Sequence, residues 1–270
     1  MCIPGNPSPS KTPNLRGSPS GSLMYQTLPS TLPLYRATSR KTKWGQVLTG
    51  EGSHFTNGGR FNFIGQPAIY ASDDPIVAIS ELAFYQAKTW QGKIGETRSP
   101  SGSTFPLVSG HRLWCFSLIS ATQIVDLLDD NSKINFSFSR LPLVNCGQAY
   151  GGTRELANDI RAYPDPKKPV ALGLRAPSVR SLGSHMVPTQ IVLFPRPGAH
   201  SATKIERCEL TIEFLDDQAN PARPDSQDIA WDRPRFRIEP GIGLATLLSD
   251  CRGGNPIPRG VWESITIRFV

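Results

Sequence analysis

Short strand-like segments separated by turns make up most of this sequence, and only two stretches have a helical pattern. The better defined helix is predicted at residues 76–90, where Asp73 or Asp74 can cap it and Pro75 suits its first turn. Strands and helices do not alternate regularly, as they would in a doubly wound parallel sheet. The sequence therefore predicts an α+β fold.

The other predicted elements are shorter. A second helix is expected at residues 152–162, after Gly151 and Gly152. The strand-like segments are residues 32–37, 68–71, 111–119, 124–128, 171–175, 190–194, 209–215 and 264–270.

Composition divides the 270 residues into three parts. Half of residues 1–30 are Pro, Gly or Ser, and such a segment buries too little apolar surface to offset its ordering entropy. We therefore expect a flexible tail at residues 1–31, a folded domain at residues 32–196, and a β-rich C-terminal extension at residues 197–270 that packs on the same domain.

Charge and apolar runs exclude several classes of protein. The net charge is +7, but residues 1–50 contain six cations and no acid, whereas residues 51–270 balance 23 cations against 22 acids. The folded part has no basic excess, which makes nucleic acid an improbable partner. No apolar run approaches the ~18 residues that a membrane span needs.

The five cysteines are odd in number and have no Cys-x-x-Cys spacing, which indicates reduced thiols in the cytoplasm. No secretory signal is evident, while the Ser-rich start leaves a transit peptide open, although its six prolines oppose an amphipathic helix. No metal site is expected, because the histidines are isolated from one another. They are His54, His111, His185 and His200.

Several residues could carry chemistry, and each also has an ordinary structural explanation. Glu81 has apolar helical neighbours, so it either reaches water at the edge of the apolar stripe or lines a pocket. Arg60 follows two glycines and offers a planar fork for phosphate or carboxylate, but surface arginines after such turns are common. Arg36 ends an apolar strand, Tyr70 could belong to the core, and Ser178 could be a turn serine.

The order of these residues resembles the RES domain family, which is named for its arginine, glutamate and serine. The matching stretches are Leu-Tyr-Arg36, Gly-Gly-Arg60-Phe-Asn, Pro-Ala-Ile-Tyr70-Ala-Ser, Glu81 behind a capped helix start, Gln148, and Gly-Leu-Arg-Ala-Pro-Ser178-Val-Arg followed by Ile-Val-Leu-Phe194. The resemblance covers residues 32–196, and Phe61 stands where members usually carry a tryptophan, so a flat apolar wall should persist there.

The resemblance implies a fold similar to ADP-ribosyltransferases, with split, mostly antiparallel sheets, a few helices and a cleft for NAD. It implies NAD as a consumed substrate, no further cofactor, and growth-inhibiting toxins that need a neutralising antitoxin protein. Carried over by position, Glu81, Arg60 and Ser178 are the expected catalytic residues. The expected NAD-binding residues are Arg36, Arg60, Tyr70, Gln148 and Ser178.

These residue types suit cleavage of the nicotinamide–ribose bond. Positive charge develops on the ribose, and a preorganised carboxylate such as that of Glu81 stabilises it. Two arginines suit the pyrophosphate. The sequence has neither a Gly-x-Gly-x-x-Gly motif after a strand nor a P-loop, consistent with NAD being consumed rather than recycled.

Two other functions stay open at this point. One is mono-ADP-ribosylation of a protein target, and the other is a non-catalytic binding module whose basic tail contacts acidic partners. The sequence does not decide whether water, phosphate or a protein accepts the ADP-ribose.

Overall fold

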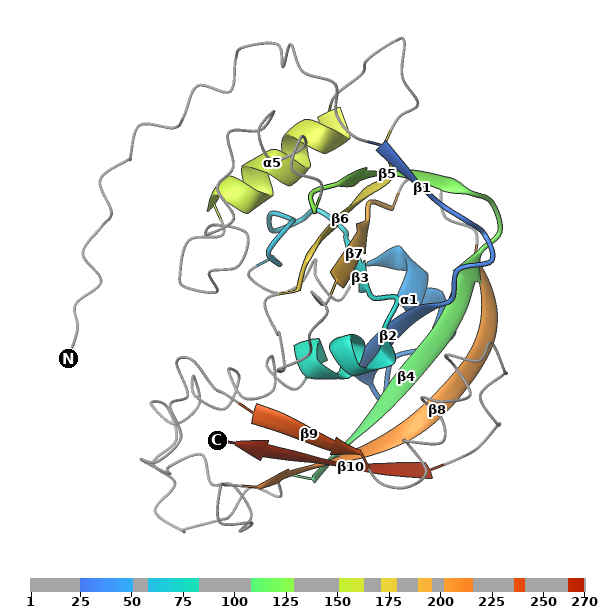
Figure 1. Cartoon of the computed structure of the whole chain (residues 1–270), viewed down its shortest axis with the longest axis vertical. Coiled ribbons are helices and arrows are strands. Elements are labelled where there is room, and N and C mark those ends of the chain that lie inside the picture. Colours follow the sequence, from blue (N-terminus) through green and yellow to red (C-terminus); the bar gives the residue numbers. More distant parts are fainter. Residues whose placement is uncertain are drawn as a thin grey trace, which may run out of the picture.

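The computed structural model describes residues 25–50, 58–82, 108–128, 151–162, 171–178, 189–195, 202–215, 236–240 and 262–269. Within these segments the strands form two five-stranded sheets (Figure 1). The parallel pairs among them are β5 with β6 and β8 with β10, and the remaining pairs are antiparallel. The predicted α+β fold with split, mostly antiparallel sheets is confirmed.

The elements have the following bounds. The first sheet consists of β1 (Tyr25–Leu28), β5 (Thr122–Asp126), β6 (Gly173–Pro177), β7 (Thr189–Leu193) and β3 (Ile69–Ala71), in this order. The second sheet consists of β2 (Leu34–Ser39), β4 (Val108–Leu118), β8 (Ala202–Leu215), β10 (Trp262–Phe269) and β9 (Phe236–Pro240). The helices are α1 (Trp44–Thr49), α5 (Gly151–Ala162) and a helix at residues 75–82, here named the Glu81 helix.

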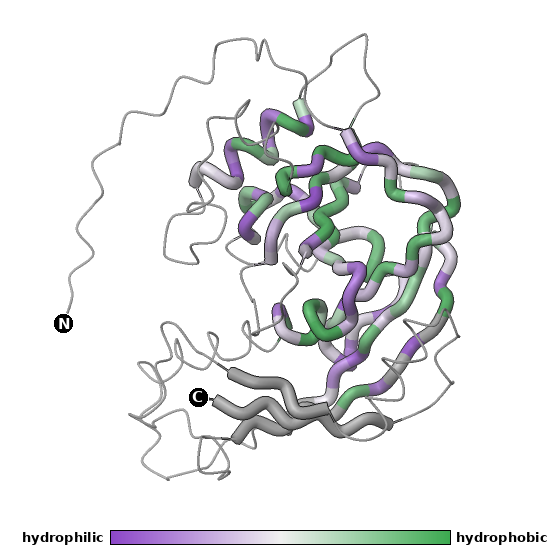
Figure 2. Tube along the Cα trace, viewed as in Figure 1, coloured by the Kyte–Doolittle hydropathy of each residue, from purple (hydrophilic) through white to green (hydrophobic). Residues whose placement is uncertain are grey.

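The first sheet is covered on both faces, and this explains its apolar strands. On one face Leu156, Ala157 and Ile160 of α5 pack in one cluster with side chains of β5, β6 and β7. The other face looks toward the second sheet and α1, and side chains from both sheets and α1 form a second cluster there. Every residue of β7 is therefore buried, and apolar positions run through the middle of the fold (Figure 2).

Residues beyond 197 extend the second sheet. β8 pairs with β4 from Ala202 opposite Leu118 to Glu213 opposite Val108, and β10 continues the sheet beside β8. The two long curved strands β4 and β8 form one side of the molecule in Figure 1. The C-terminal part that the structure describes is therefore β-rich, as predicted.

Three elements were not predicted. The expected tail at residues 1–31 overlaps β1, in which Leu28 is buried and Tyr25 lies opposite Val125 of β5. The composition of the first thirty residues gives no indication of this four-residue strand, because β5, the strand that stabilises it, lies about a hundred residues away in the chain. β9 was also missed, within a Pro/Arg-rich connection.

The third missed element is α1. It has only six residues, too few for a helical periodicity to stand out in the sequence, and it ends at Gly50, whose φ of 67° is left-handed. Gln46 caps its start by accepting a hydrogen bond from the Lys43 backbone N–H at 2.9 Å.

No helix in the described segments is long and apolar enough to cross a membrane.

Candidate functional site

The Glu81 helix starts where the sequence predicts. The Asp74 carboxylate accepts a hydrogen bond from the Ile76 backbone N–H at 2.8 Å, which makes Asp74 the N-cap, and Pro75 follows in the first turn. Val77 and Ile79 are buried and fix the helix against the fold. Glu81 is half-buried in the following turn, and residues 83–90 of the predicted helix lie outside the described segments.

Ser178 contacts Glu81 directly. Ser178 follows the last residue of β6, is 3% exposed, and its hydroxyl donates a hydrogen bond to Glu81 Oε1 at 2.7 Å. The two residues are 97 positions apart in the chain, so this contact depends on the tertiary fold. A hydrogen bond from a buried hydroxyl fixes the orientation of the carboxylate.

Arg60 reaches the same place from another segment. Its Nη1 donates to the carbonyl oxygen of Pro177 at 2.8 Å, so the guanidinium lies beside the residue that precedes Ser178. Arg60 is 4% exposed, and its Cζ lies 4.7 Å from the centre of the Phe61 ring. Phe61 itself is fully buried in the cluster under α5, so it supports Arg60 from the core instead of forming an open apolar wall.

Tyr70 holds the Arg60 loop, defined here as residues 58–66. Its hydroxyl donates to Asn62 Oδ1 at 2.6 Å and accepts a hydrogen bond from the Phe61 backbone N–H at 2.9 Å. The Asn62 oxygen also accepts from the Gly59 N–H at 2.9 Å. A side chain at Gly59 would overlap the Tyr70 hydroxyl, which explains why this position is a glycine.

α5 anchors the Arg60 loop from the opposite side. The Thr153 hydroxyl donates to the Arg60 carbonyl oxygen at 2.6 Å, and Arg154 Nε donates to the Gly59 carbonyl oxygen at 2.8 Å. Sequence reasoning missed these two residues and Asn62. The sequence predicts a helix at residues 152–162, but it does not indicate which polar side chains of that helix face the Arg60 loop.

Arg36 of β2 lies near Tyr70 and completes the site. Its Nη1 donates to the Val47 carbonyl oxygen of α1 at 2.6 Å. Burial lowers the pKa of Arg36 to about 10, and the nearby Tyr70 phenol partly offsets this effect. Arg36 therefore keeps its positive charge at neutral pH.

Five of the six predicted site residues thus form one connected series. Arg36 interacts with Tyr70, Tyr70 bonds the Arg60 loop, Arg60 bonds the residue before Ser178, and Ser178 bonds Glu81. The sixth, Gln148, lies outside the described residues.

The series is not uniformly accessible. Arg60 and Ser178 are almost fully buried, whereas Arg36, Tyr70 and Glu81 are half-buried. The described segments contain no group of three or more His, Cys, Asp or Glu side chains that could hold a metal ion. Within this series of described residues, the partly exposed side chains are therefore the Glu81 carboxylate, the Arg36 guanidinium and the Tyr70 phenol.

Comparison with known proteins gives one family. The family model of the RES domain matches residues 33–234, a range that continues past residue 196 and includes all of β8. No curated protein matches the chain. Among solved structures, a chain in the crystal structure of the M. tuberculosis MbcT–MbcA toxin–antitoxin complex is similar at a TM-score of 0.43 and 17% sequence identity, over 64% of this chain and 82% of that one.

Proposed function

This chain belongs to the RES domain family, and we propose that it is an enzyme that consumes NAD by cleaving the nicotinamide–ribose bond. The observation that carries the proposal is the contact between Ser178 and Glu81 beside the buried Arg60 guanidinium. In this arrangement the Glu81 carboxylate is held in one orientation. A carboxylate fixed in this way can stabilise the positive charge of an oxocarbenium-like transition state.

Glu81 is the residue proposed to face the ribose. As the bond to nicotinamide breaks, positive charge develops on the sugar, and the carboxylate stabilises this charge without having to reorient. Ser178 fixes the carboxylate through Oε1. Its near-complete burial favours this role over direct contact with the substrate.

The pyrophosphate of NAD carries about two negative charges and needs a cation. We propose Arg36 as the main cation that binds the pyrophosphate. Arg36 is half-buried, and its hydrogen bond to the Val47 carbonyl oxygen orients the guanidinium. A guanidinium has five N–H donors, so one such bond orients the group for further hydrogen bonds. Arg60 adds a second positive charge beside Ser178, and its burial limits the solvent screening of that charge.

Tyr70 is proposed to support both arginines. Both the donor and an acceptor position of its hydroxyl bond the Arg60 loop, so the ring face, not the hydroxyl, is the part that suits stacking on nicotinamide. In this proposal NAD is a substrate that is used up, and no other cofactor takes part.

A RES-type activity of this kind would deplete cytoplasmic NAD and inhibit growth. We therefore propose that the chain is the toxin of a toxin–antitoxin pair, restrained by an antitoxin protein. Co-expression with a cognate antitoxin should restore growth that expression of the chain alone suppresses.

The central test is the release of nicotinamide from NAD by the purified chain, with and without phosphate. Mass spectrometry of the sugar product identifies the acceptor: free ADP-ribose for water, its phosphorylated form for phosphate, or ADP-ribose attached to a protein. The matched variant is Glu81→Gln, for which we expect a loss of at least ~3 kcal/mol of transition-state stabilisation, about 150-fold in kcat. Absence of nicotinamide release under all these conditions would refute the proposal, and near-normal turnover by the variant would remove Glu81 from the mechanism.

A further inference from the structure

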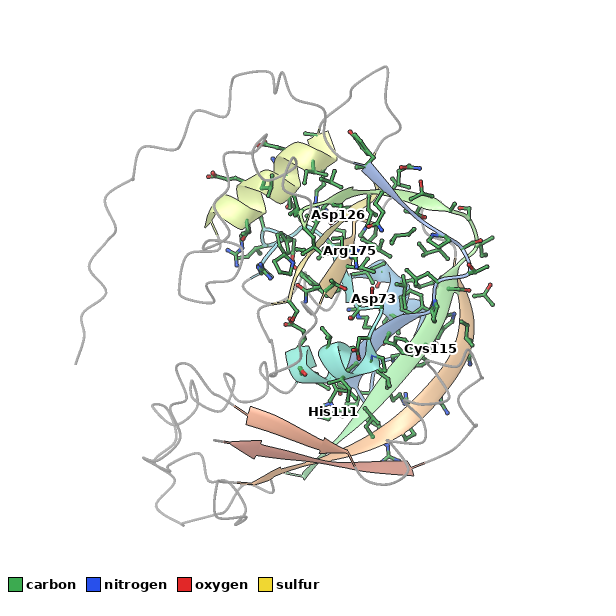
Figure 3. All side chains as sticks on the ribbon, in the orientation of Figure 1. Asp73, His111, Cys115, Asp126 and Arg175 are labelled. Carbon is green, nitrogen blue, oxygen red and sulfur yellow. The ribbon has the colours of Figure 1, made fainter. Side chains whose placement is uncertain are left out.

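A second polar cluster lies in the first sheet, apart from the residues assigned above. Arg175 of β6 has its Nη2 3.7 Å from Asp73 Oδ2 and its Nη1 3.7 Å from Asp126 Oδ2. Figure 3 shows these three residues in a row that leads from β5 toward the start of the Glu81 helix. Gln26 of β1 adds a long hydrogen bond from Arg175 Nη1 to its Oε1 at 3.4 Å.

Asp73 directly precedes the N-cap of the Glu81 helix, and several bonds hold this point. The Thr189 hydroxyl of β7 donates to Asp73 Oδ1 at 2.6 Å. The Ser72 hydroxyl donates to the Thr189 carbonyl oxygen at 2.8 Å and accepts from the Asp74 N–H at 3.0 Å. The first residues of the helix are therefore tied to β6 and β7.

β6 and the residue that follows it thus contact the Glu81 helix and the residue before its N-cap at two places. Arg175 meets Asp73 just before the helix, and Ser178, three residues further along, bonds Glu81. Two separate contacts between a strand and a helix fix both the position of the helix and its rotation about its own axis. We propose that Arg175 is a positioning residue for Glu81, acting through Asp73 and the start of the helix.

Loss of the guanidinium has a definite consequence. The side chains of Asp73 and Asp126 are 30% and 18% exposed, so removing the guanidinium takes away the cation that both partly buried carboxylates share. We expect the repulsion between them to shift Asp73, and with it the start of the Glu81 helix, relative to β6. A displacement of about 1 Å at a reacting group costs roughly 100-fold in rate.

This inference rests on the proposed function for its kinetic part. Arg175→Met should lower kcat roughly 10- to 100-fold. The KM for NAD should change less than about threefold, because the contacts of Arg175 lie with Asp73, Asp126 and Gln26 and not with the guanidinium groups of Arg36 and Arg60. Arg175→Lys keeps the charge between the two carboxylates and should recover most of kcat.

The matched control is Arg112→Met. Arg112 also pairs with a carboxylate, Nε to Glu209 Oε1 at 2.7 Å, but it does so in the second sheet. This variant should lower the melting temperature and leave kcat unchanged when both variants are assayed well below their transitions. Equal kcat values for the two methionine variants, a loss confined to KM, or no rescue by Arg175→Lys would overturn the inference.

A second measurement does not depend on activity. Amide hydrogen exchange across residues 76–82 should speed up in Arg175→Met and stay as in the wild type in Arg112→Met. Unchanged exchange in Arg175→Met would overturn the positioning role. If the wild type released no nicotinamide while exchange changed as expected, the proposed reaction would be wrong and the positioning role would stand.

Discussion

The hydrogen bond between Ser178 and Glu81 allows a quantitative test of how the site works. Ser178→Ala removes a hydroxyl that is 3% exposed and 2.7 Å from Glu81 Oε1. A hydrogen bond to a charged group contributes about 1.5–3 kcal/mol. If it holds the carboxylate in its productive orientation, its loss lowers kcat about 10- to 150-fold.

The assay is nicotinamide release at saturating NAD, for the wild type, Ser178→Ala, Glu81→Gln and the double variant. A residue that acts through Glu81 has nothing left to orient in the Glu81→Gln background. We therefore expect Ser178→Ala to change the activity of Glu81→Gln by less than about threefold. Effects that multiply in the double variant would refute the reasoning and would place the Ser178 hydroxyl on the substrate itself.

The control for folding is Thr38→Val in the second sheet. Thr38 is also buried, and its hydroxyl accepts a hydrogen bond from Trp114 Nε1 at 2.9 Å. This variant loses a comparable buried hydrogen bond with no contact to Glu81. Its melting temperature should fall while kcat stays at the wild-type value, so a loss of kcat in Ser178→Ala cannot be assigned to general destabilisation.

Three further predictions concern stability. Tyr70→Phe leaves the buried Phe61 N–H without its acceptor and should lower the free energy of unfolding by about 1–3 kcal/mol in urea titration, whereas an unchanged midpoint would contradict the role given to Tyr70. Gly59→Ala places a Cβ 2.6 Å from Asn62 Oδ1 and should cost about 1–3 kcal/mol, while Gly45→Ala, with open space around it, should be neutral or stabilising. Burial lowers the pKa of His111, against a smaller opposing effect of a backbone hydrogen bond involving Thr38, so the unfolded chain takes up a proton first as pH falls below about 6.5. Stability should therefore decline with acidification from that pH, and His111→Gln should show a shallower decline in thermal melts at pH 7 and pH 5.

Local signals in the sequence were sufficient for the elements that carry the site. Asp74 and Pro75 marked the start of the Glu81 helix because capping is a property of neighbouring residues. The apolar run at residues 190–194 predicted β7, which is buried on both faces. The two glycines before Arg60 indicated a close backbone approach, and the Tyr70 hydroxyl is the group that approaches.

Long-range partners were beyond the same reasoning. Thr153 and Arg154 donate hydrogen bonds to the Arg60 loop although they lie more than ninety residues from it in the chain. Nothing in the local sequence of α5 distinguishes these two residues from its other polar residues. β1 was missed for a related reason, because four residues form a strand only when β5 supplies their hydrogen bonds. Five of the residues selected by the RES resemblance lie together in the structure, but the contacts among them could not be predicted from the sequence.

The position of β6 in the chain has a consequence for synthesis. Glu81 and Arg60 leave the ribosome well before residues 173–178, which supply the hydroxyl for one and the carbonyl oxygen for the other. A nascent fragment that stops short of β6 contains the Glu81 carboxylate and the Arg60 guanidinium without the residues that hydrogen-bond to them. Under the proposed function, activity would therefore arise late in translation, which would leave an interval in which the proposed antitoxin could bind the emerging chain.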